Sequence, residues 1–181
     1  MESFPSLTAF LPKPQAPITV LHIDDDPDET VLLYSATRKA GIEFSLHNVQ
    51  DGEQAIAYLS GEGIYADRNK YKIPALIFLD LKLPRATGFE VLKWIRAHPE
   101  LGDLQVVVLS GSEQQDDMLR AYSTGADSYL VKPSEFDVLV SMMKNINALW
   151  LTASNGQRSE RANVEQGQFM LTQGARMPTS A

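Results

Sequence analysis

The stretch that decides the fold is ITVLHIDDDP, residues 18–27. Its first six residues form a short apolar run, which stops at the consecutive aspartates Asp24, Asp25 and Asp26. A short apolar run that ends in turn residues is typical of a strand buried inside a sheet. Pro27 then fits the first turn of a helix, where the missing N–H of proline costs nothing. We therefore expect a strand followed directly by a helix.

The same alternation of strand and helix continues to about residue 152. Apolar runs at residues 44–49, 75–79, 106–109 and 128–131 predict four more strands, each followed by a helical pattern. Parallel neighbours need crossover helices, which are right-handed in nearly all cases. The pattern predicts an α/β fold: a flavodoxin-like, doubly wound sandwich with a five-stranded parallel sheet in order 2-1-3-4-5.

The segments outside this alternation differ from it in composition. Residues 1–17 contain four prolines and indicate an N-terminal proline-rich arm. Residues 154–181 are rich in Gln, Ser, Gly and Arg and predict a flexible tail rather than an effector domain. We expect residues 18–153 to form one domain. A polar connection at residues 61–72 is longer than the roughly 4–6 residues that usually join two elements.

Composition and charge exclude several classes of protein. The net charge of −7 argues against a nucleic-acid surface, which is usually basic. The absence of cysteine excludes disulfides, thiol catalysis and cysteine-ligated metals. The N-terminus lacks the pattern of a signal peptide, and no apolar run approaches the roughly 20 residues that span a bilayer. We expect a soluble, cytoplasmic protein that binds neither nucleic acid nor membrane.

Polar side chains follow the predicted strands at the points where the strands end. The aspartates at 24–26 follow the first strand, Asp80 the third, Ser110 the fourth and Lys132 the fifth. Each alone has an ordinary explanation as a turn residue, a helix cap or a solvated lysine. Ligands of open α/β sheets bind beyond the carboxyl ends of the strands. We therefore expect one shallow pocket with several carboxylates, a hydroxyl and an ammonium group.

The chemistry of this pocket suits a phosphoryl acceptor. Carboxylates that are packed together repel one another, which raises their pKa values or demands a cation. Mg²⁺ typically takes one or two carboxylates together with phosphate oxygens. A carboxylate can attack a phosphoryl donor when the charge on the transferred oxygens is neutralised, and Mg²⁺, Lys132 and the Ser110 hydroxyl suit that task.

Four motifs carry a resemblance to a known family: IDDDP (23–27), FLDLKLPRATG (78–88), VVLSGS (107–112) and YLVKP (129–133). Each alone is weak, but all four in this order and at these separations are highly specific. Over roughly residues 18–153 the sequence resembles the receiver domain of bacterial response regulators. The long 61–72 connection and the runs around residues 80–92 and 116–133 resemble the small regulators paired with bacteriophytochrome histidine kinases.

The resemblance implies how an acceptor and its metal would be arranged. Asp80 would be the phosphorylated residue, and Asp25 would ligate Mg²⁺ directly. Asp24 would hold the metal mainly through water, and the backbone carbonyl of Lys82 would complete the protein ligands. Asp26 is interpreted as a helix cap rather than a ligand.

The resemblance also implies a switch. Ser110 would be the hydroxyl that turns toward the phosphoryl group, and Tyr129 the aromatic side chain that moves inward with it. Lys132 would pair with the phosphoryl oxygens, and its peptide bond to Pro133 would be cis.

The implied function is that of a stand-alone response regulator in a two-component phosphorelay. It would take its phosphoryl group from a sensor histidine kinase, for which the resemblance suggests a bacteriophytochrome, and act on an unidentified downstream protein. It would not be an enzyme but a phosphoacceptor that promotes its own Mg²⁺-dependent phosphorylation and dephosphorylation.

A helix expected from Ser134, its predicted N-cap, to about residue 152 carries two apolar stripes. At about 100° per residue, one stripe should face the sheet and comprises Phe136, Leu139, Val140, Met143, Ile146 and Trp150. Val138, Met142 and Leu149 fall roughly on the opposite side. Scattered surface hydrophobes are normal, but a second stripe favours a partner surface. We expect a homodimer through the face formed by the fourth helix, the fifth strand and the fifth helix.

Other interpretations compete with this one. A flavodoxin-like enzyme or binding module needs a phosphate loop rich in Gly, Ser or Thr where this chain has three aspartates. A haloacid-dehalogenase-type phosphatase would usually carry a second Asp at Lys82. A DNA-binding output would need a basic recognition helix, for which residues 154–181 are too few. A receiver that acts as a scaffold without being phosphorylated is the alternative that stays open.

Overall fold

The computed structural model describes residues 18–148, and its strands form one parallel sheet. The strands run in the order β2-β1-β3-β4-β5, with adjacent strands paired in parallel. Their bounds are β1 (Thr19–Ile23), β2 (Ser45–Val49), β3 (Leu76–Leu79), β4 (Gln105–Ser110) and β5 (Ser128–Val131). The predicted flavodoxin-like order 2-1-3-4-5 is confirmed.

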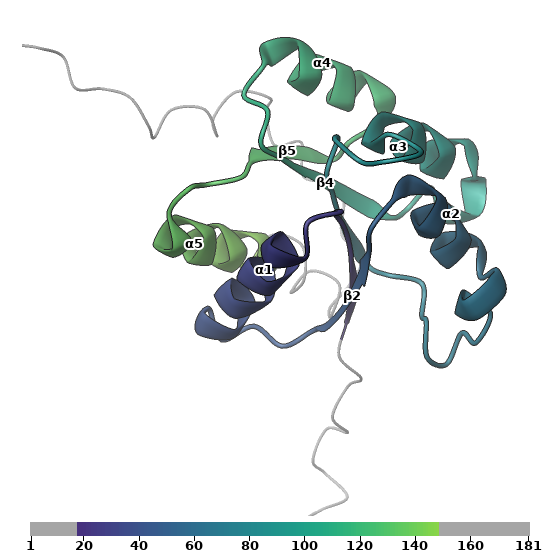
Figure 1. Cartoon of the computed structure of the whole chain (residues 1–181), viewed down its shortest axis with the longest axis horizontal. Helices are drawn as coiled ribbons and strands as arrows, with labels where there is room; N and C mark the ends of the chain where they lie inside the picture. Colours follow the sequence, from purple (N-terminus) through teal and green to yellow (C-terminus); the bar gives the residue numbers. More distant parts are fainter. Residues whose placement is uncertain (1–17, 149–181) are drawn as a thin grey trace, which may run out of the picture.

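Helices cover both faces of the sheet. Figure 1 shows α1 and α5 on one face and α2, α3 and α4 on the other. The helices are α1 (Pro27–Lys39), α2 (Gly52–Ser60), α3 (Gly88–Ala97), α4 (Gln115–Thr124) and α5 (Phe136–Ile146), with short 3₁₀ turns η2 (Gly63–Tyr65) and η3 (Pro99–Leu101).

Each face of the sheet has its own core, because successive strand residues point to opposite sides. Val20, Phe78 and Val107 pack beneath α1 and α5. Ile23 and Ile77 belong to the core on the other face. With both faces buried, the strands carry the nearly continuous apolar runs found in the sequence.

The helix starts follow from local capping. The Asp26 side chain accepts a hydrogen bond from the Asp28 N–H at 2.9 Å, which confirms Asp26 as the cap of α1. The predicted cap of α5 was wrong. A bend over Ser134 and Glu135 precedes that helix, which begins at Phe136 and has no side-chain capping bond. Of the predicted inner stripe, Leu139, Val140, Met143 and Ile146 are buried, whereas Phe136 is exposed.

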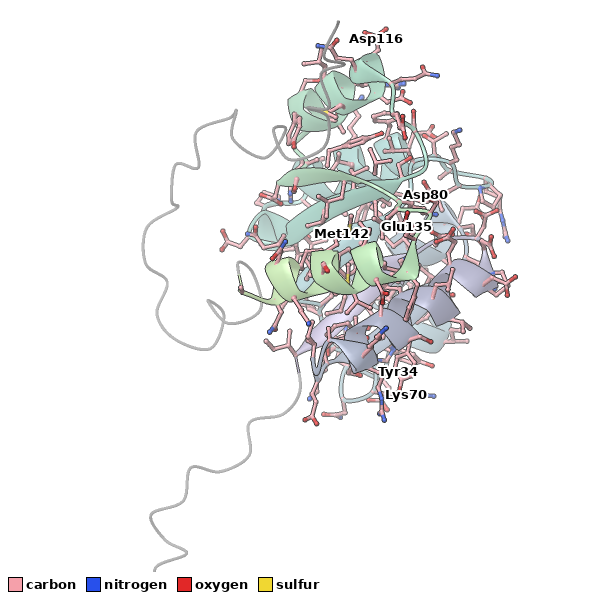
Figure 2. All side chains as sticks on the ribbon, turned by 90° about the vertical axis from the view of Figure 1, so that its left-hand side faces the viewer. Tyr34, Lys70, Asp80, Asp116, Glu135 and Met142 are labelled. Carbon is pink, nitrogen blue, oxygen red and sulfur yellow. The ribbon has the colours of Figure 1, made fainter. Side chains whose placement is uncertain are left out.

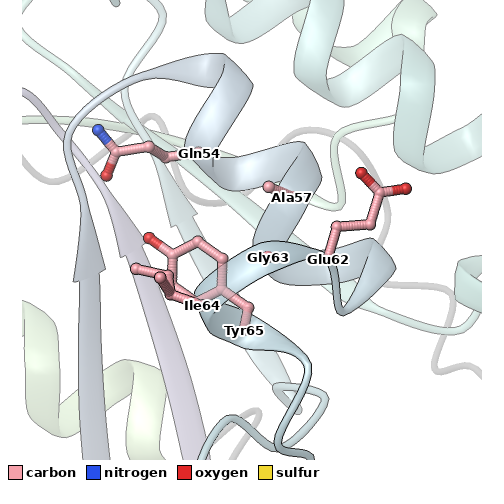
Figure 3. Close-up of a pocket in the computed structure, with 6 residues that line it drawn as sticks. All are labelled: Gln54, Ala57, Glu62, Gly63, Ile64 and Tyr65. Carbon is pink, nitrogen blue, oxygen red and sulfur yellow. The ribbon is translucent and has the colours of Figure 1, made fainter.

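The long polar connection after α2 is ordered around one arginine. The Arg68 guanidinium donates hydrogen bonds to the carbonyls of Tyr58, Leu59 and Tyr71. A hollow of about 380 Å³ lies between α2 and η2, as Figure 3 shows. It is lined by Gln54, Ala57, Glu62, Gly63, Ile64 and Tyr65. None of the residues predicted to form the functional pocket lines it.

Some expectations fall outside the part of the chain that the structure describes. These are the arm at residues 1–17, the tail at 154–181, and Leu149 and Trp150 of the apolar stripes. Within residues 18–148, no helix is long and apolar enough to cross a bilayer.

Candidate functional site

Three carboxylates meet at the carboxyl edge of the sheet. Asp24 and Asp25 follow β1, Asp80 follows β3, and these two strands are neighbours. The Asp80 N–H donates to the Ile23 carbonyl at 3.0 Å, which continues the pairing of the strands up to the site. Carboxylate oxygens of Asp24, Asp25 and Asp80 lie within 4.8 Å of one another. The structure thus brings together the acidic residues that the sequence placed at strand ends.

Lys132 approaches this cluster from the end of β5. Its Nζ lies 2.7 Å from Asp24 Oδ2 and 3.6 Å from Asp80 Oδ2. Asp24 is buried, and its Oδ1 accepts a hydrogen bond from the Asp26 N–H at 3.0 Å. Both oxygens of Asp24 therefore have donors from the protein.

These contacts shift the protonation of both partners. Burial by itself would raise the pKa of Asp24, but hydrogen bonds with His22, Lys132 and the Asp26 N–H outweigh it and lower the pKa to about 2. Burial would lower the pKa of Lys132, but the carboxylates of Asp24 and Asp80 outweigh it and raise that pKa above its ordinary value. At neutral pH the pair is therefore an ammonium beside a carboxylate.

The free energy of unfolding of the metal-free protein should fall as acid protonates Asp24. A carboxyl group with a lowered folded-state pKa stabilises the fold above its unfolded pKa of 3.8, and the contribution is lost as pH falls toward 2. The lowering of the Asp24 pKa from 3.8 to about 2 corresponds to about 2 kcal/mol of folding stability. Urea unfolding between about pH 5 and pH 2 measures it. The free energy of unfolding should depend less steeply on pH in Asp24→Asn than in wild type. It should depend on pH as in wild type in Asp116→Asn, because Asp116 is an exposed residue of α4. Equal slopes in all three proteins would contradict the assignment.

Asp80 has an atom that the protein leaves without a partner. Its Oδ1 is buried and makes no hydrogen bond. Buried polar atoms are nearly always hydrogen-bonded, so such an atom indicates a missing ion, water or reacting group. Mg²⁺ and similar hard cations take oxygen ligands, which the three carboxylates supply. The residues present therefore fit a divalent cation. Lys82 lies in the loop after β3, with its side chain exposed.

Ser110 ends β4, Tyr129 lies within the adjacent β5, and both side chains contact Ser112 in the loop after β4. Ser110 is fully buried at the end of β4, and its Oγ accepts from the Ser112 N–H at 3.3 Å. The Tyr129 hydroxyl donates to the Ser112 carbonyl at 2.9 Å. Burial raises the pKa of Tyr129 despite its hydrogen bonds to Ser110 and Ser112, so this hydroxyl stays protonated and able to donate.

Tyr129, the predicted switch aromatic, is 6% exposed, so its ring lies inward in this structure. One expected feature of this region differs from the structure. The peptide bond between Lys132 and Pro133 is trans, so the expected cis bond was wrong. Trans is the form that most bonds before proline take in folded proteins.

The loop after Asp80 is fixed by contacts that the sequence analysis did not find. Arg85 has a left-handed backbone, with φ of 67°, which is uncommon for a residue with a side chain. Its guanidinium lies 2.7 Å from Oδ2 of Asp51, a buried aspartate whose other oxygen caps α2. This ion pair ties the loop after the candidate acceptor to the start of α2.

Comparison with known proteins agrees with this geometry. Residues 20–144 match the response regulator receiver domain family. The chain belongs to this family. The response regulator Rcp1 of Synechocystis sp. is 33% identical over 135 residues, which cover 75% of this chain and 90% of Rcp1.

Solved receivers share the fold. The phosphorylated cyanobacterial phytochrome response regulator RcpA is 33% identical, with a TM-score of 0.70 over 78% of this chain and 98% of RcpA. The Mn²⁺-bound form of Rcp1 is 32% identical, with a TM-score of 0.67 over 76% of this chain and 96% of that one. The bacteriophytochrome response regulator RtBRR is 28% identical, with a TM-score of 0.60 over 80% of this chain and 99% of RtBRR. This receiver is thus homologous to two-component response regulators, including phytochrome-associated ones.

Proposed function

We propose that this receiver accepts a phosphoryl group on Asp80 in a reaction that depends on Mg²⁺. The observation that carries the proposal is the Asp80 carboxylate, whose Oδ1 has no hydrogen-bond partner and whose Oδ2 lies 3.6 Å from Lys132 Nζ. A carboxylate oxygen that is not held by the protein is available to attack the phosphorus atom of a donor, so that an O–P bond forms as the bond from phosphorus to the leaving group (acetate, when the donor is acetyl phosphate) breaks. Membership of the receiver family supports the same role.

The other residues of the site then have separate tasks. Asp24, Asp25 and Asp80 would hold the cation, with the backbone carbonyl of Lys82 as a further ligand. The cation supplies neutralisation of the charge on the phosphoryl oxygens. Lys132 contributes a second positive charge beside Asp80. The Mn²⁺-bound form of Rcp1 supports a divalent ion, and Mg²⁺ suits the same oxygen ligands.

The experiment is incubation with acetyl phosphate, with and without Mg²⁺, followed by measurement of intact mass. Wild type should gain the mass of one phosphoryl group only when Mg²⁺ is present. Asp80→Asn should gain none, and the exposed control Asp116→Asn should behave as wild type. A gain in Asp80→Asn equal to that of wild type would contradict the proposal. Folded wild-type protein that never gains the group would favour the scaffold interpretation.

The effect of phosphorylation would be transmitted from the site to α4 and β5 through the loop after β4. When Ser110 turns toward the phosphoryl group, its Oγ has to leave the Ser112 N–H. Ser112 also accepts from the Tyr129 hydroxyl and donates from its own Oγ to Asp117 on α4 at 2.6 Å. A change at Ser110 is therefore connected with the start of α4 and with β5. Such a change is a shift between two populated states.

The phosphoryl donor would be a sensor histidine kinase, with a bacteriophytochrome kinase favoured by the relatives RcpA and RtBRR. The receiver would then act on another protein. The net charge of −7 gives no support to a nucleic-acid partner.

A homodimer through α4, β5 and α5 is the partner arrangement that we propose. Leu119 and Tyr122 are exposed on α4, with 59% and 45% of their surface accessible. Val138 is half-buried on α5, and Met142 is half-buried and packs partly against the core. Figure 2 shows Met142 on α5, which lies beside α1. The apolar surface of this face therefore includes α4 as well as the predicted stripe.

Light scattering of the phosphorylated and unphosphorylated protein tests the dimer. Leu119→Glu and Met142→Glu should each convert a dimer into monomers, because a charge would be buried at the interface. Asn145→Glu, an exposed change on α5, should leave the mass unchanged. A dimer that keeps its mass in Leu119→Glu and Met142→Glu, or a wild type that is monomeric in both states, would contradict the proposed interface.

A further inference from the structure

A buried imidazole lies directly behind the acidic cluster and has no task in the function proposed above. His22 is on β1 and is 1% exposed. Its strand neighbours Leu21 and Ile23 are apolar, as expected for a strand that is buried on both faces. A polar side chain in such a strand needs hydrogen-bond partners, and the partners of His22 connect it with the site.

Both ring nitrogens of His22 face polar atoms. Nδ1 lies 3.0 Å from the Thr30 hydroxyl on α1, and Nε2 lies 3.4 Å from Asp24 Oδ2. A carboxylate can only accept a hydrogen bond, whereas a hydroxyl can donate or accept. In the tautomer that satisfies all three groups, the proton is on Nε2 and the Thr30 hydroxyl donates to Nδ1. The Asp24 carboxylate therefore favours the tautomer in which His22 donates from Nε2, and Thr30 orients the ring by donating to Nδ1.

The oxygen that His22 faces is the one that Lys132 also contacts, at 2.7 Å. A phosphoryl group on Asp80 would compete with Asp24 for the Lys132 ammonium, which lies 3.6 Å from Asp80 Oδ2. His22 is in β1, two residues before Asp24, and takes no part in that competition. We propose that His22, oriented by Thr30, is a positioning residue that holds the Asp24 carboxylate for the divalent cation. This inference rests on the proposed function, because it concerns the same site.

The surroundings of His22 allow the ring to be replaced. A hollow of about 40 Å³ lies beside it, lined also by Glu29, Leu32, Leu109 and Lys132 among others. This space is larger than the roughly 10–15 Å³ that one water needs. The imidazole is therefore not tightly enclosed on every side, and a side chain of similar size can take its place.

The test compares the Mg²⁺ Kd of full-length variants by isothermal titration calorimetry. His22→Leu removes the donor and should weaken binding by about 10- to 100-fold, the usual cost of losing a residue that orients a metal ligand. His22→Gln keeps an N–H that can point at Asp24 and should recover most of the affinity. Thr30→Val removes the hydroxyl that orients the His22 ring through Nδ1 and should cause a smaller loss of affinity. Thr30 is half-buried near the start of α1, so we expect Thr30→Val to fold. This variant therefore still tests the proposal if His22→Leu does not fold.

Phosphorylation by acetyl phosphate gives a second measurement on the same samples. His22→Leu should need more Mg²⁺ for half-maximal phosphorylation, with an unchanged maximal rate once Mg²⁺ is saturating. Loss of that maximal rate, or an equal Kd loss in the Gln and Leu variants, would overturn the role of His22. If wild type gains the phosphoryl group and the variants bind Mg²⁺ as tightly, only the role of His22 fails. Wild type that neither binds Mg²⁺ nor gains the group would overturn both proposals.

Discussion

Replacing Lys132 with methionine is expected to slow phosphorylation of Asp80 by roughly 100- to 1,000-fold, the usual cost of removing one group that stabilises developing charge. Lys132 Nζ is the cation that the structure places beside Asp80, at 3.6 Å from Oδ2. Mg²⁺ should still bind, and more tightly, because Nζ no longer occupies Asp24 Oδ2 at 2.7 Å. The variant should thus separate metal binding from phosphoryl transfer.

The initial rate with acetyl phosphate at saturating Mg²⁺ measures the slower phosphorylation. Isothermal titration calorimetry measures the tighter binding of Mg²⁺. Lys93→Met is the matched control, because Lys93 is exposed on α3. Lys132→Arg keeps the charge but replaces a compact ammonium with a planar fork, so we expect it to restore only part of the rate. A rate within a few fold of wild type in Lys132→Met would show that the ammonium has no part in the transfer.

Gly88→Ala is expected to destabilise the fold by about 3 kcal/mol or more, at the upper end of what overpacking causes. A Cβ at Gly88 would lie 2.1 Å from the Asp80 carbonyl oxygen and 2.7 Å from Leu81 Cα. Both are backbone atoms, which cannot turn aside as a flexible side chain would. The loop that follows the acceptor would have to shift, and Asp80 would shift with it.

Urea unfolding measures this loss, and Mg²⁺ affinity reports the displacement of Asp80. Gly111→Ala is the control, because a Cβ there meets nothing within 4 Å although the residue directly follows Ser110. It should change stability by less than about 0.5 kcal/mol. Equal stabilities of the Gly88 and Gly111 variants would mean that the close approach at Gly88 is relieved without cost.

The central part of the site could be predicted because it follows from one geometric rule. Asp24, Asp80 and Lys132 each directly follow a strand, and the carboxyl ends of neighbouring parallel strands lie at one edge of the sheet. Strand order was predictable for a similar reason, since crossover connections leave few topologies. Each of these features can be recognised from a local pattern.

The parts that were missed depend on contacts between distant residues. Nothing in the local sequence distinguishes His22 from a core histidine, because its partner Thr30 is on the next helix. The pairing of Arg85 with Asp51 joins two loops that are far apart in the chain. The predicted cap of α5, Ser134, was wrong because a bend over Ser134 and Glu135 precedes the helix, which begins at Phe136. A short polar segment gives little information about the residue at which a helix begins.

The central claim is that Asp80 itself carries the phosphoryl group, and borohydride trapping tests it most directly. The protein is phosphorylated with acetyl phosphate and Mg²⁺, reduced with sodium borohydride, which converts an aspartyl phosphate to homoserine, and then digested for tandem mass spectrometry. The account predicts homoserine at position 80 and at no other aspartate. Homoserine at position 24 or 25, or a phosphorylated protein whose position 80 is still aspartate after reduction, would contradict it.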